Sequence, residues 1–488
     1  MFRFARCFNH PKVAVALALV TATAAQAANV EGQLDPHFSG DGRTYVEFST
    51  QSGPFLLHAN SVAKAVALQA DGKTVVAGDV DLGGGHWGIG LTRLNVDGSV
   101  DPTFGTLGKR QFNFSNASVH AKALLVQPDG KIVVAGSYEA DGTGNSQFLA
   151  VRFNADGVNT DPGFGLFGYY LVDFGSGADV ANSVALAGDG SLFLAGYMTS
   201  AVPDLDFGLA KLKANGVVDT AFGTQGLVQI YFDQGGDFDD AASSVAIQSD
   251  GKVVVAGSVR RATGENEFGL ARVDAGTGAY DTSFGNLAGR TGLSVLSLHS
   301  AGTACYDDAE ALAINEISFR TIYVGGTHCA LASGATAAVA AFGDDGKLAT
   351  VFNSGSGAEY VDLYSGYNTQ EGSTMVLQSQ GPFLPKVIIA GSGRSTTFNN
   401  NRDFLMARTD YQGNIDTLFG NAGHQAVYFN AVGGGLGDDI VHAAAMSGEG
   451  YLILAGSRQA NSAGDYDFAI ARLLVGDSIF RNGFEMQF

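Results

Sequence analysis

The sequence predicts an all-β fold, a seven-bladed β-propeller made of four-stranded antiparallel blades. Three observations predict it. The 488-residue chain repeats one pattern seven times, an Asp-Gly turn joins two strand-forming runs in most copies, and the last part of the seventh copy stands near the N-terminus. A regular period of this kind is typical of repeat architectures, and four-stranded repeats that close radially form propellers.

The repeat is clearest at one dipeptide, which is Ala-Gly in six copies and Gly-Gly in the fifth. Successive copies are 58, 60, 61, 69, 65 and 65 residues apart. The seven positions are Ala77-Gly78, Ala135-Gly136, Ala195-Gly196, Ala256-Gly257, Gly325-Gly326, Ala390-Gly391 and Ala455-Gly456. Spacing this regular favours structural units of one kind over unrelated domains.

Residues 62–114 show what one copy contains. Runs of small, β-branched and aromatic residues predict strands over 62–68, 74–77, 89–95 and 109–114. Asp71-Gly72, between the first two runs, is a strong hairpin signal because both residues tolerate the positive φ of a tight turn. No stretch of useful length is helical in pattern. Each copy is therefore expected to be a four-stranded antiparallel sheet.

The two ends of the repeat predict how the ring closes. The seventh copy stops after its third strand, at Arg472-Leu473-Leu474, and its missing connector and fourth strand are found at 34–38 and 43–48. An N-terminal strand that completes the last blade would leave no open sheet edge, which removes the aggregation hazard of unpaired strands.

Paired charges support this closure. A basic residue ends the third strand in six copies, and an Asp stands in the connector that follows. The expected intrablade pairs are Arg93 with Asp101, Arg152 with Asp161, Lys211 with Asp219, Arg272 with Asp281, Arg408 with Asp416, and Arg472 with Asp35 across the closure. The fifth copy has Ala341 and Ala349, so both partners are missing together. Structural ion pairs are the favoured interpretation, and a ring of ligand-binding arginines is the alternative.

The N-terminus has the pattern of a secretory signal over residues 1–27. Arg3, Arg6 and Lys12 surround the start of an apolar run at 13–20, and Ala25-Gln26-Ala27 fits a cleavage site. The predicted propeller then covers 28–475, with a tail at 476–488. Cleavage would move the formal charge from −20 to −23, which argues against nucleic-acid binding. We expect a monomer, secreted or periplasmic or at the cell surface, with no transmembrane segment in the mature chain.

Cys305 and Cys329 both lie in the fifth copy, on either side of its predicted hairpin. A disulfide between them is geometrically reasonable, and an oxidising compartment favours it over a metal or catalytic role.

The sequence contains no metalloprotease, nucleophile-elbow or phosphate-loop motif. Histidines such as His120 are scattered, and we interpret them as solvated loop residues. Several acidic loops could offer oxygen ligands to calcium, although none has the spacing of a calcium loop, and solvated turn carboxylates are the favoured interpretation. These calcium candidates are Asp79, Asp81, Asp237, Asp239 and Asp240. No other cofactor is expected.

The first strand of each copy gives one further set of residues. Propellers line their central channel with the innermost strand, so one polar position in each first strand is expected to face the channel or its mouth. These positions are Lys64, Lys122, Asn182, Ser243, Glu310, Ser373 and His442. A polar, water-filled pore is the simpler interpretation, and a ligand pocket is the alternative.

The repeat consensus, Val-Ala-Leu-Gln-x-Asp-Gly-Lys-x-Val-Val-Ala-Gly with an Asp-Pro-x-Phe-Gly connector, resembles the bacterial delta-60 repeat family of β-propellers over roughly residues 34–475. The resemblance implies secretion or an envelope location and provides no catalytic residue to carry over. The tail resembles short Ile-Phe-x-Asp-Gly-Phe-Glu endings of some exported bacterial proteins, with Asn482 at the Asp position. A sorting or retention signal is one hypothesis for it, and a disordered end is the other.

The function expected from these features is a binding or scaffold module at the cell envelope or outside the cell, with a protein or glycan partner. Variable loops on a rigid repeated frame favour it. The alternative is a hydrolase or lyase with its site at the channel mouth, which would need groups such as Glu310 and His442 to converge.

Overall fold

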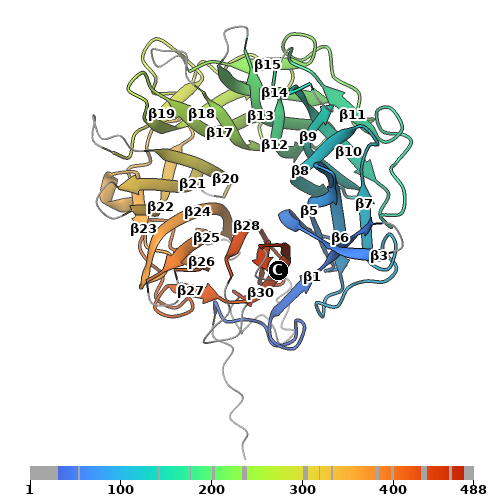
Figure 1. Ribbon diagram of the computed structural model, residues 1–488. Coiled ribbons are helices and arrows are strands. Elements are labelled where there is room, and N and C mark those ends of the chain that lie inside the picture. The colour runs from blue at the N-terminus through green and yellow to red at the C-terminus, as the bar shows by residue number, and fades with distance from the viewer. Residues whose placement is uncertain are drawn as a thin grey trace, which may run out of the picture.

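The computed structural model describes residues 31–52, 55–140, 143–175, 177–200, 204–232, 239–299, 306–317, 319–330, 334–379, 384–396, 400–429, 437–460 and 464–476. Seven four-stranded antiparallel sheets radiate from a central axis (Figure 1), which confirms the predicted seven-bladed propeller. In these residues the one helical element is a short 3-10 turn, η1 (Asn353–Gly355), and no helix is long and apolar enough to cross a membrane.

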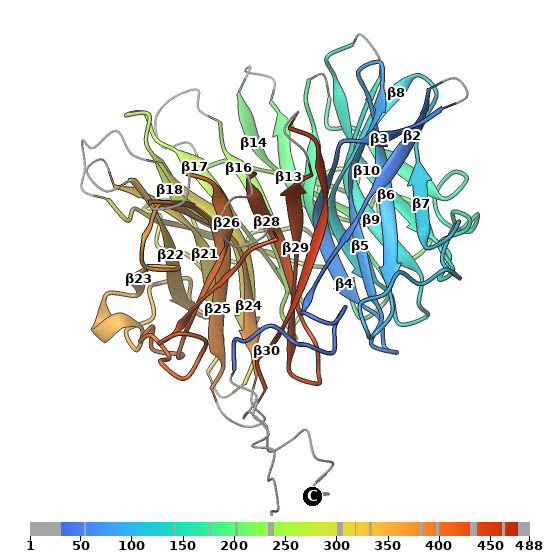
Figure 2. The same ribbon diagram turned by 60° about the horizontal axis from the view of Figure 1, so that its bottom comes forward.

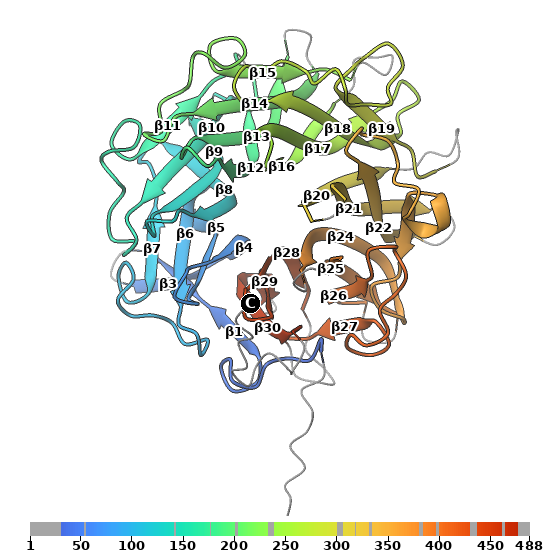
Figure 3. The same ribbon diagram turned by 180° about the vertical axis from the view of Figure 1, so that it is seen from behind.

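The blades follow the chain, and each has its first strand nearest the axis (Figures 1 and 3). Blade 1 contains β4 (Ser61–Leu68), β5 (Thr74–Gly83), β6 (His86–Leu94) and β7 (Lys109–Phe112), and blade 2 contains β8 (Ala117–Val126), β9 (Ile132–Ala140), β10 (Ser146–Phe153) and β11 (Tyr169–Val172). Blade 3 contains β12 (Val180–Leu186), β13 (Leu192–Thr199), β14 (Leu205–Leu212) and β15 (Leu227–Ile230), and blade 4 contains β16 (Ala241–Ile247), β17 (Lys252–Arg260), β18 (Asn266–Asp274) and β19 (Leu293–Leu296). Blade 5 contains β20 (Asp307–Asn315), β21 (Thr321–Ala330), β22 (Gly334–Gly343) and β23 (Ala358–Val361), and blade 6 contains β24 (Tyr367–Gln378), β25 (Lys386–Ser395), β26 (Arg402–Thr409) and β27 (His424–Val427).

Blade 7 joins the two ends of the chain. It consists of β28 (Asp439–Met446), β29 (Tyr451–Gln459) and β30 (Tyr466–Leu474), and its outer strand is β1 (Arg43–Val46). β1 pairs antiparallel with β30, from Arg43 opposite Ala471 to Val46 opposite Phe468. The predicted closure by the N-terminal strand is therefore confirmed.

The hydrophobic core is divided among the interfaces between neighbouring blades. One buried cluster, for example, joins Val75 and Leu91 of blade 1 to Val134 and Leu149 of blade 2. The middle strands of a blade are buried on both faces. This explains why β5, β9 and β17 contain continuous apolar runs rather than alternating apolar and polar residues. Burial on both faces makes each blade depend on its neighbours.

One element has no counterpart in the sequence prediction. β2 (Phe48–Ser52) and β3 (Phe55–Ala59) form a separate hairpin that lies beside blade 1 (Figure 2). Phe48 is buried and its ring lies 4.9 Å from that of Phe468 in blade 7. The hairpin therefore covers part of the joint between the first and last blades.

Candidate functional site

The six predicted ion pairs are all formed, at the ends of the third strands. The shortest N–O distance is 2.8 Å for Arg93–Asp101, Arg152–Asp161 and Arg472–Asp35, 2.9 Å for Arg272–Asp281 and Arg408–Asp416, and 3.3 Å for Lys211–Asp219. Each cation also lies over the ring of the buried Phe in its connector, as Arg152 does over Phe164 at 4.5 Å. These side chains are largely buried, so their charges need partners, which the Asp residues supply.

Several of the same cations also reach the next blade. Arg93 donates to the carbonyl of Ala155 and Arg152 to that of Ala214, each at 2.8 Å, and Lys211 donates to that of Ala275 at 2.9 Å. Because each of these side chains binds an Asp of its own blade and a carbonyl of the next, it links two neighbouring blades. This arrangement supports the structural interpretation over a ring of ligand-binding arginines.

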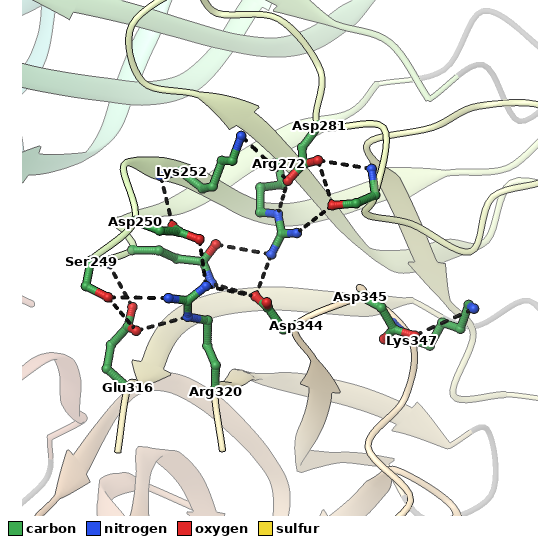
Figure 4. Close-up of polar contacts among 12 residues, drawn as sticks. Ser249, Asp250, Lys252, Arg272, Asp281, Glu316, Arg320, Asp344, Asp345 and Lys347 are labelled. Carbon is green, nitrogen blue, oxygen red and sulfur yellow. Dashed lines mark hydrogen bonds and ion pairs between the residues drawn. The ribbon is translucent and has the colours of Figure 1, made fainter. Parts of the chain in front are cut away.

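The fifth copy, which lacks the pair, is attached in another way (Figure 4). Arg272 of blade 4 binds Asp344 of blade 5 at 2.8 Å, and Arg320 of blade 5 binds Asp250 of blade 4 at 2.7 Å and Glu316 at 3.0 Å. An ion-pair network therefore joins blades 4 and 5. This network is structural and lies outside the candidate site.

The seven predicted channel positions share one backbone feature: each is the extra residue of a β-bulge in an inner strand. The register shifts by one residue across each of them, for example between Ala63 and Ala65 at Lys64 and between Ala121 and Ala123 at Lys122. We call this set the bulge ring: Lys64, Lys122, Asn182, Ser243, Glu310, Ser373 and His442. A bulge re-aims a side chain and breaks local pairing, and such features are frequent beside functional sites.

The bulge also explains the repeated glycine. The glycine at the second position of each aligned dipeptide lies opposite the bulge. A Cβ at that glycine would stand between 1.7 and 2.1 Å from a carbonyl oxygen of the inner strand. No side chain fits at that distance. The glycine that makes the repeat visible in the sequence is therefore required because the bulged strand leaves no room for a side chain opposite it.

Members of the bulge ring differ in how they are used. Asn182 donates to the carbonyl of Ala242 at 2.8 Å, and Ser243 donates to that of Ala309 at 2.6 Å, so both link an inner strand to the next blade. In the described part of the chain, Lys64, Lys122, Glu310 and His442 have no hydrogen-bond or ion-pair partner. Ser373 also has none among the described residues, so the members available to a ligand are Ser373 and these four ionisable side chains.

These four side chains share one electrostatic environment. Glu310 is solvent-exposed, but the surrounding blades exclude part of the water that would solvate its charge. This desolvation, with the negative charges of Asp308 and Glu371, raises the pKa of Glu310 to about 7. The positive charge of Lys122, on blade 2, opposes that rise. Burial, with Lys64 and Lys122, lowers the pKa of His442 to about 3, so His442 is neutral at pH 7.

Glu310 and His442 themselves do not form a catalytic pair. They lie on blades 5 and 7, with blade 6 between them, and neither contributes to the pKa shift of the other. The convergence that the hydrolase or lyase alternative required of these two residues is absent from the described structure.

A pocket of about 340 Å³ opens beside the ring where blades 2 and 3 meet. We call it the blade 2–3 pocket, and it is lined by His120, Lys122, Ser137, Glu139, Gly144, Ser146, Ala178, Val180 and Tyr197. Lys122 belongs both to this pocket and to the bulge ring. The lining is mostly polar and carries a cation, an imidazole, a phenol and one carboxylate.

The environment of His120 differs from the solvated loop predicted for it, and that interpretation was wrong. His120 lies on β8, and its Nδ1 is 3.2 Å from Asp79 of blade 1. The other Asp79 oxygen accepts the backbone N–H of Ala121 at 2.8 Å. Asp79 is buried and bridges two blades. The sequence did not indicate this pair because its members belong to different copies.

Tyr197 is the second residue that the sequence analysis missed. It directly follows the aligned dipeptide, where the other six copies have Asp79, Ser137, Ser258, Thr327, Ser392 and Ser457. In several blades this residue accepts the N–H of the next inner strand, as Ser392 does from Val441 at 3.0 Å. A bulky phenol at this position departs from the repeat. That departure was visible in the sequence and is the signal that would have identified Tyr197.

The calcium candidates are not gathered at one place. Asp81 accepts the N–H of Gly83 at 2.8 Å, Asp239 that of Leu205 at 3.2 Å, and Asp240 that of Arg260 at 2.9 Å. In the described ranges no three His, Cys, Asp or Glu side chains are grouped as metal ligands. Asp237 and Cys305 lie outside these ranges, as do residues 1–30, which include the predicted signal sequence, and residues 477–488. Calcium binding and the Cys305–Cys329 disulfide stay predictions.

Comparisons with known proteins agree with the architecture. Residues 69–104, 127–164, 187–222 and 248–284 match a family model described as a domain of unknown function (DUF5122) beta-propeller, which supports a β-propeller family. No curated protein matches the chain.

Solved structures of similar fold include an ulvan lyase from a new family of polysaccharide lyases, at 10% identity over 86% of this chain and 94% of that chain, with a TM-score of 0.50. A protein of unknown function from Dyadobacter fermentans is 11% identical over 74% of this chain and 95% of that chain, with a TM-score of 0.43. The Hadza microbial sialidase Hz136 is 13% identical over 72% of this chain and 66% of that chain, with a TM-score of 0.38. At such identities the similarity concerns the fold alone.

Proposed function

We propose that the protein is an exported binding module that takes an acidic glycan in the blade 2–3 pocket and the adjoining part of the channel. The observation that carries the proposal is Lys122, a cation without a hydrogen-bond or ion-pair partner in the described structure, in a concave polar pocket. Pockets with a few convergent polar groups are the usual place of ligand binding.

The chemistry of the lining favours an acidic sugar. Lys122 would pair with a carboxylate or sulfate group, hydroxyl and imidazole groups would bond sugar hydroxyls, and the Tyr197 ring offers a face to a sugar ring. Asp308, Glu310 and Glu371 lie on blades 5 and 6, away from the pocket, and their charge disfavours an anion on that side. The anionic group would therefore lie at blades 1 to 3.

The cellular setting is part of the same proposal. The signal-like residues 1–27 support export, and the acidic net charge favours solubility outside the cell over adhesion to anionic surfaces. The repeat consensus and the family match on four copies support assigning the chain to the delta-60 repeat kind. N-terminal sequencing of the exported protein would test the expected start at Ala28.

A single tryptophan provides the binding assay. Trp87 lies on β6, and its ring centroid is 6.0 Å from that of His120, so its fluorescence reports on the pocket. We would titrate the protein with tri-galacturonate, a hyaluronan tetrasaccharide and an alginate trisaccharide, and with maltotriose as a neutral oligosaccharide. The proposal predicts a saturable change with at least one acidic oligosaccharide and none with maltotriose.

A matched pair of variants makes this assay specific. Lys122→Met should weaken acidic-oligosaccharide binding by about tenfold or more, because a charge-assisted contact is lost. Lys347→Met makes the same substitution at an exposed lysine of blade 5 and should bind as the unaltered protein does. Equal affinity of both variants, or equal responses to acidic and neutral sugars, would overturn the proposed site.

A further inference from the structure

We infer that the blade 2–3 pocket is catalytic and cleaves a uronate-containing glycan by β-elimination, with His120 as base, Lys122 as the cation at the uronate carboxylate and Tyr197 as proton donor. The inference rests on the proposed function, since it uses the same pocket and the same class of ligand. It adds a reaction, and it assigns a separate role to each of three residues that line one cavity.

His120 is held in the form that a base needs. The Asp79 carboxylate only accepts hydrogen bonds, so the 3.2 Å contact places the ring hydrogen on Nδ1 and leaves the Nε2 lone pair free. Asp79 is itself fixed by the N–H of Ala121 at 2.8 Å. A histidine oriented by a buried carboxylate is the arrangement expected of a general base, and Asp79 is its positioning residue.

Lys122 meets the second requirement. Removal of the proton at the carbon next to a uronate carboxylate makes that carboxylate into a dianionic enolate, which needs a cation beside it. Lys122 lies two residues after His120 on the same bulged strand, and the bulge turns it toward the same pocket. Because it has no hydrogen-bond or ion-pair partner in the described structure, its charge is available to the enolate.

Tyr197 meets the third requirement. Burial, together with the charges of Asp179 and Glu139, raises the pKa of Tyr197, so the phenol keeps its proton at neutral pH. Tyr197 on the blade 3 wall lines the same pocket as His120 on the blade 2 wall, and its phenol carries the proton that a leaving oxygen would need. Tyr197 stands where the other six copies have Asp, Ser or Thr, which indicates a role other than the inter-blade contact made in other copies.

Elimination fits this lining better than hydrolysis does. Glycoside hydrolysis generally uses two carboxyl groups on either side of the scissile bond. Among the described residues that line the pocket, Glu139 is the one carboxylate; Asp79 does not line it and is bonded to His120 and Ala121. The groups present are a base, a cation and an acid.

The proposed step balances without any further reactant. His120 Nε2 takes the C5 proton of the uronate, the C4–O4 bond breaks as the C4=C5 double bond forms, and Tyr197 gives its proton to O4. The products are a glycan fragment carrying a free hydroxyl where O4 left as the leaving group and a fragment ending in a 4,5-unsaturated uronate. Transfer of the His120 proton back to Tyr197, directly or through solvent, restores the site.

The test measures binding and chemistry on the same samples. Each acidic polymer (polygalacturonate, hyaluronan, alginate and ulvan) is incubated with the full-length exported protein, and the ultraviolet absorbance of the unsaturated product is followed beside Trp87 fluorescence. His120→Asn and Tyr197→Phe should each lower the rate by about 10²-fold or more, with binding changed less than about threefold. Asp79→Asn should also lower the rate at unchanged binding, because an amide favours the other tautomer of His120.

Two substitutions serve as controls: His58→Asn removes a histidine bound to Asp467 at 2.7 Å, and Tyr45→Phe changes an exposed tyrosine of β1; both should keep the full rate. Saturable binding without unsaturated product would overturn the catalytic inference and leave the binding module standing. Absence of binding to every polymer would overturn both. Product whose rate is unaffected in His120→Asn and Tyr197→Phe would overturn the assigned roles.

Discussion

Substitution of Arg472 tests how much the ion pair that joins the two ends of the chain contributes to the free energy of unfolding. Arg472 binds Asp35, 437 residues away in the sequence, through Nε at 2.9 Å, and its guanidinium lies over Phe38 at 4.7 Å. Asp35 is 1% exposed, so Arg472→Met would leave a buried carboxylate without its cation. Such a loss costs about 3–5 kcal/mol of unfolding free energy.

The free-energy loss converts to a measurable shift in melting temperature. With an unfolding entropy of about 2.1 cal/mol/K per residue over roughly 450 residues, a loss of about 3–5 kcal/mol lowers Tm by about 3–5 °C. Differential scanning calorimetry of Arg472→Met, Asp35→Asn and the double variant measures this directly. The double variant should lose less than the sum of the two single losses, because the two groups interact.

A matched variant separates ring closure from the ion pair itself. Arg152→Met breaks the corresponding pair with Asp161 inside blade 2, where the chain is continuous. Lys131 stays 3.1 Å from Asp161 in Arg152→Met, so that variant should lower Tm by less, and Arg472→Met alone should make residues around β1 sensitive to protease at temperatures below Tm. A buried carboxylate left without its cation should lower Tm by several degrees, so a change below about 1 °C for Arg472→Met would refute the reasoning.

Three further predictions follow from other parts of the molecule. Gly136→Ala places a Cβ 1.8 Å from a carbonyl of the bulged strand and should destabilise by about 3 kcal/mol or more, whereas Gly188→Ala, with nothing within 4 Å, should stay within about 1 kcal/mol of the unaltered protein by urea unfolding. Burial raises the pKa of Asp439 to about 7, so the folded state binds more protons than the unfolded state above about pH 4, and stability should fall as pH rises from about 4 to 7. Asp439→Asn should flatten that part of the Tm–pH curve, and an unchanged slope would contradict the assignment. Non-reducing peptide mapping should find Cys305 linked to Cys329, and a free thiol at both would contradict that pairing.

Much of the frame could be predicted because each repeat encodes its own geometry locally. Asp-Gly turns, strand-forming runs and the connector with its Asp are read within one copy, and the simultaneous absence of both charges at Ala341 and Ala349 indicated a physical pair. The ring positions were found by counting from the turn. The bulges that define them were not predicted, although the glycine opposite each bulge is their sequence signal.

The rest depends on contacts that no single copy contains. Asp79 meets His120 across the joint between blades 1 and 2, and Arg320 meets Asp250 across that between blades 4 and 5. Hairpin β2–β3 has no repeated counterpart, so periodicity gave no information about it. Tyr197, where the third copy departs from the other six, contributes to the pocket.

A crystal structure of the protein soaked with the acidic oligosaccharide that binds in the Trp87 titration would test the central claim most directly, namely that the blade 2–3 pocket binds acidic glycans. The account predicts density for a sugar between β8 and β13, with a carboxylate in contact with Lys122 and the sugar ring beside Tyr197. An empty pocket at a saturating concentration, or a ligand bound elsewhere on the propeller, would contradict it.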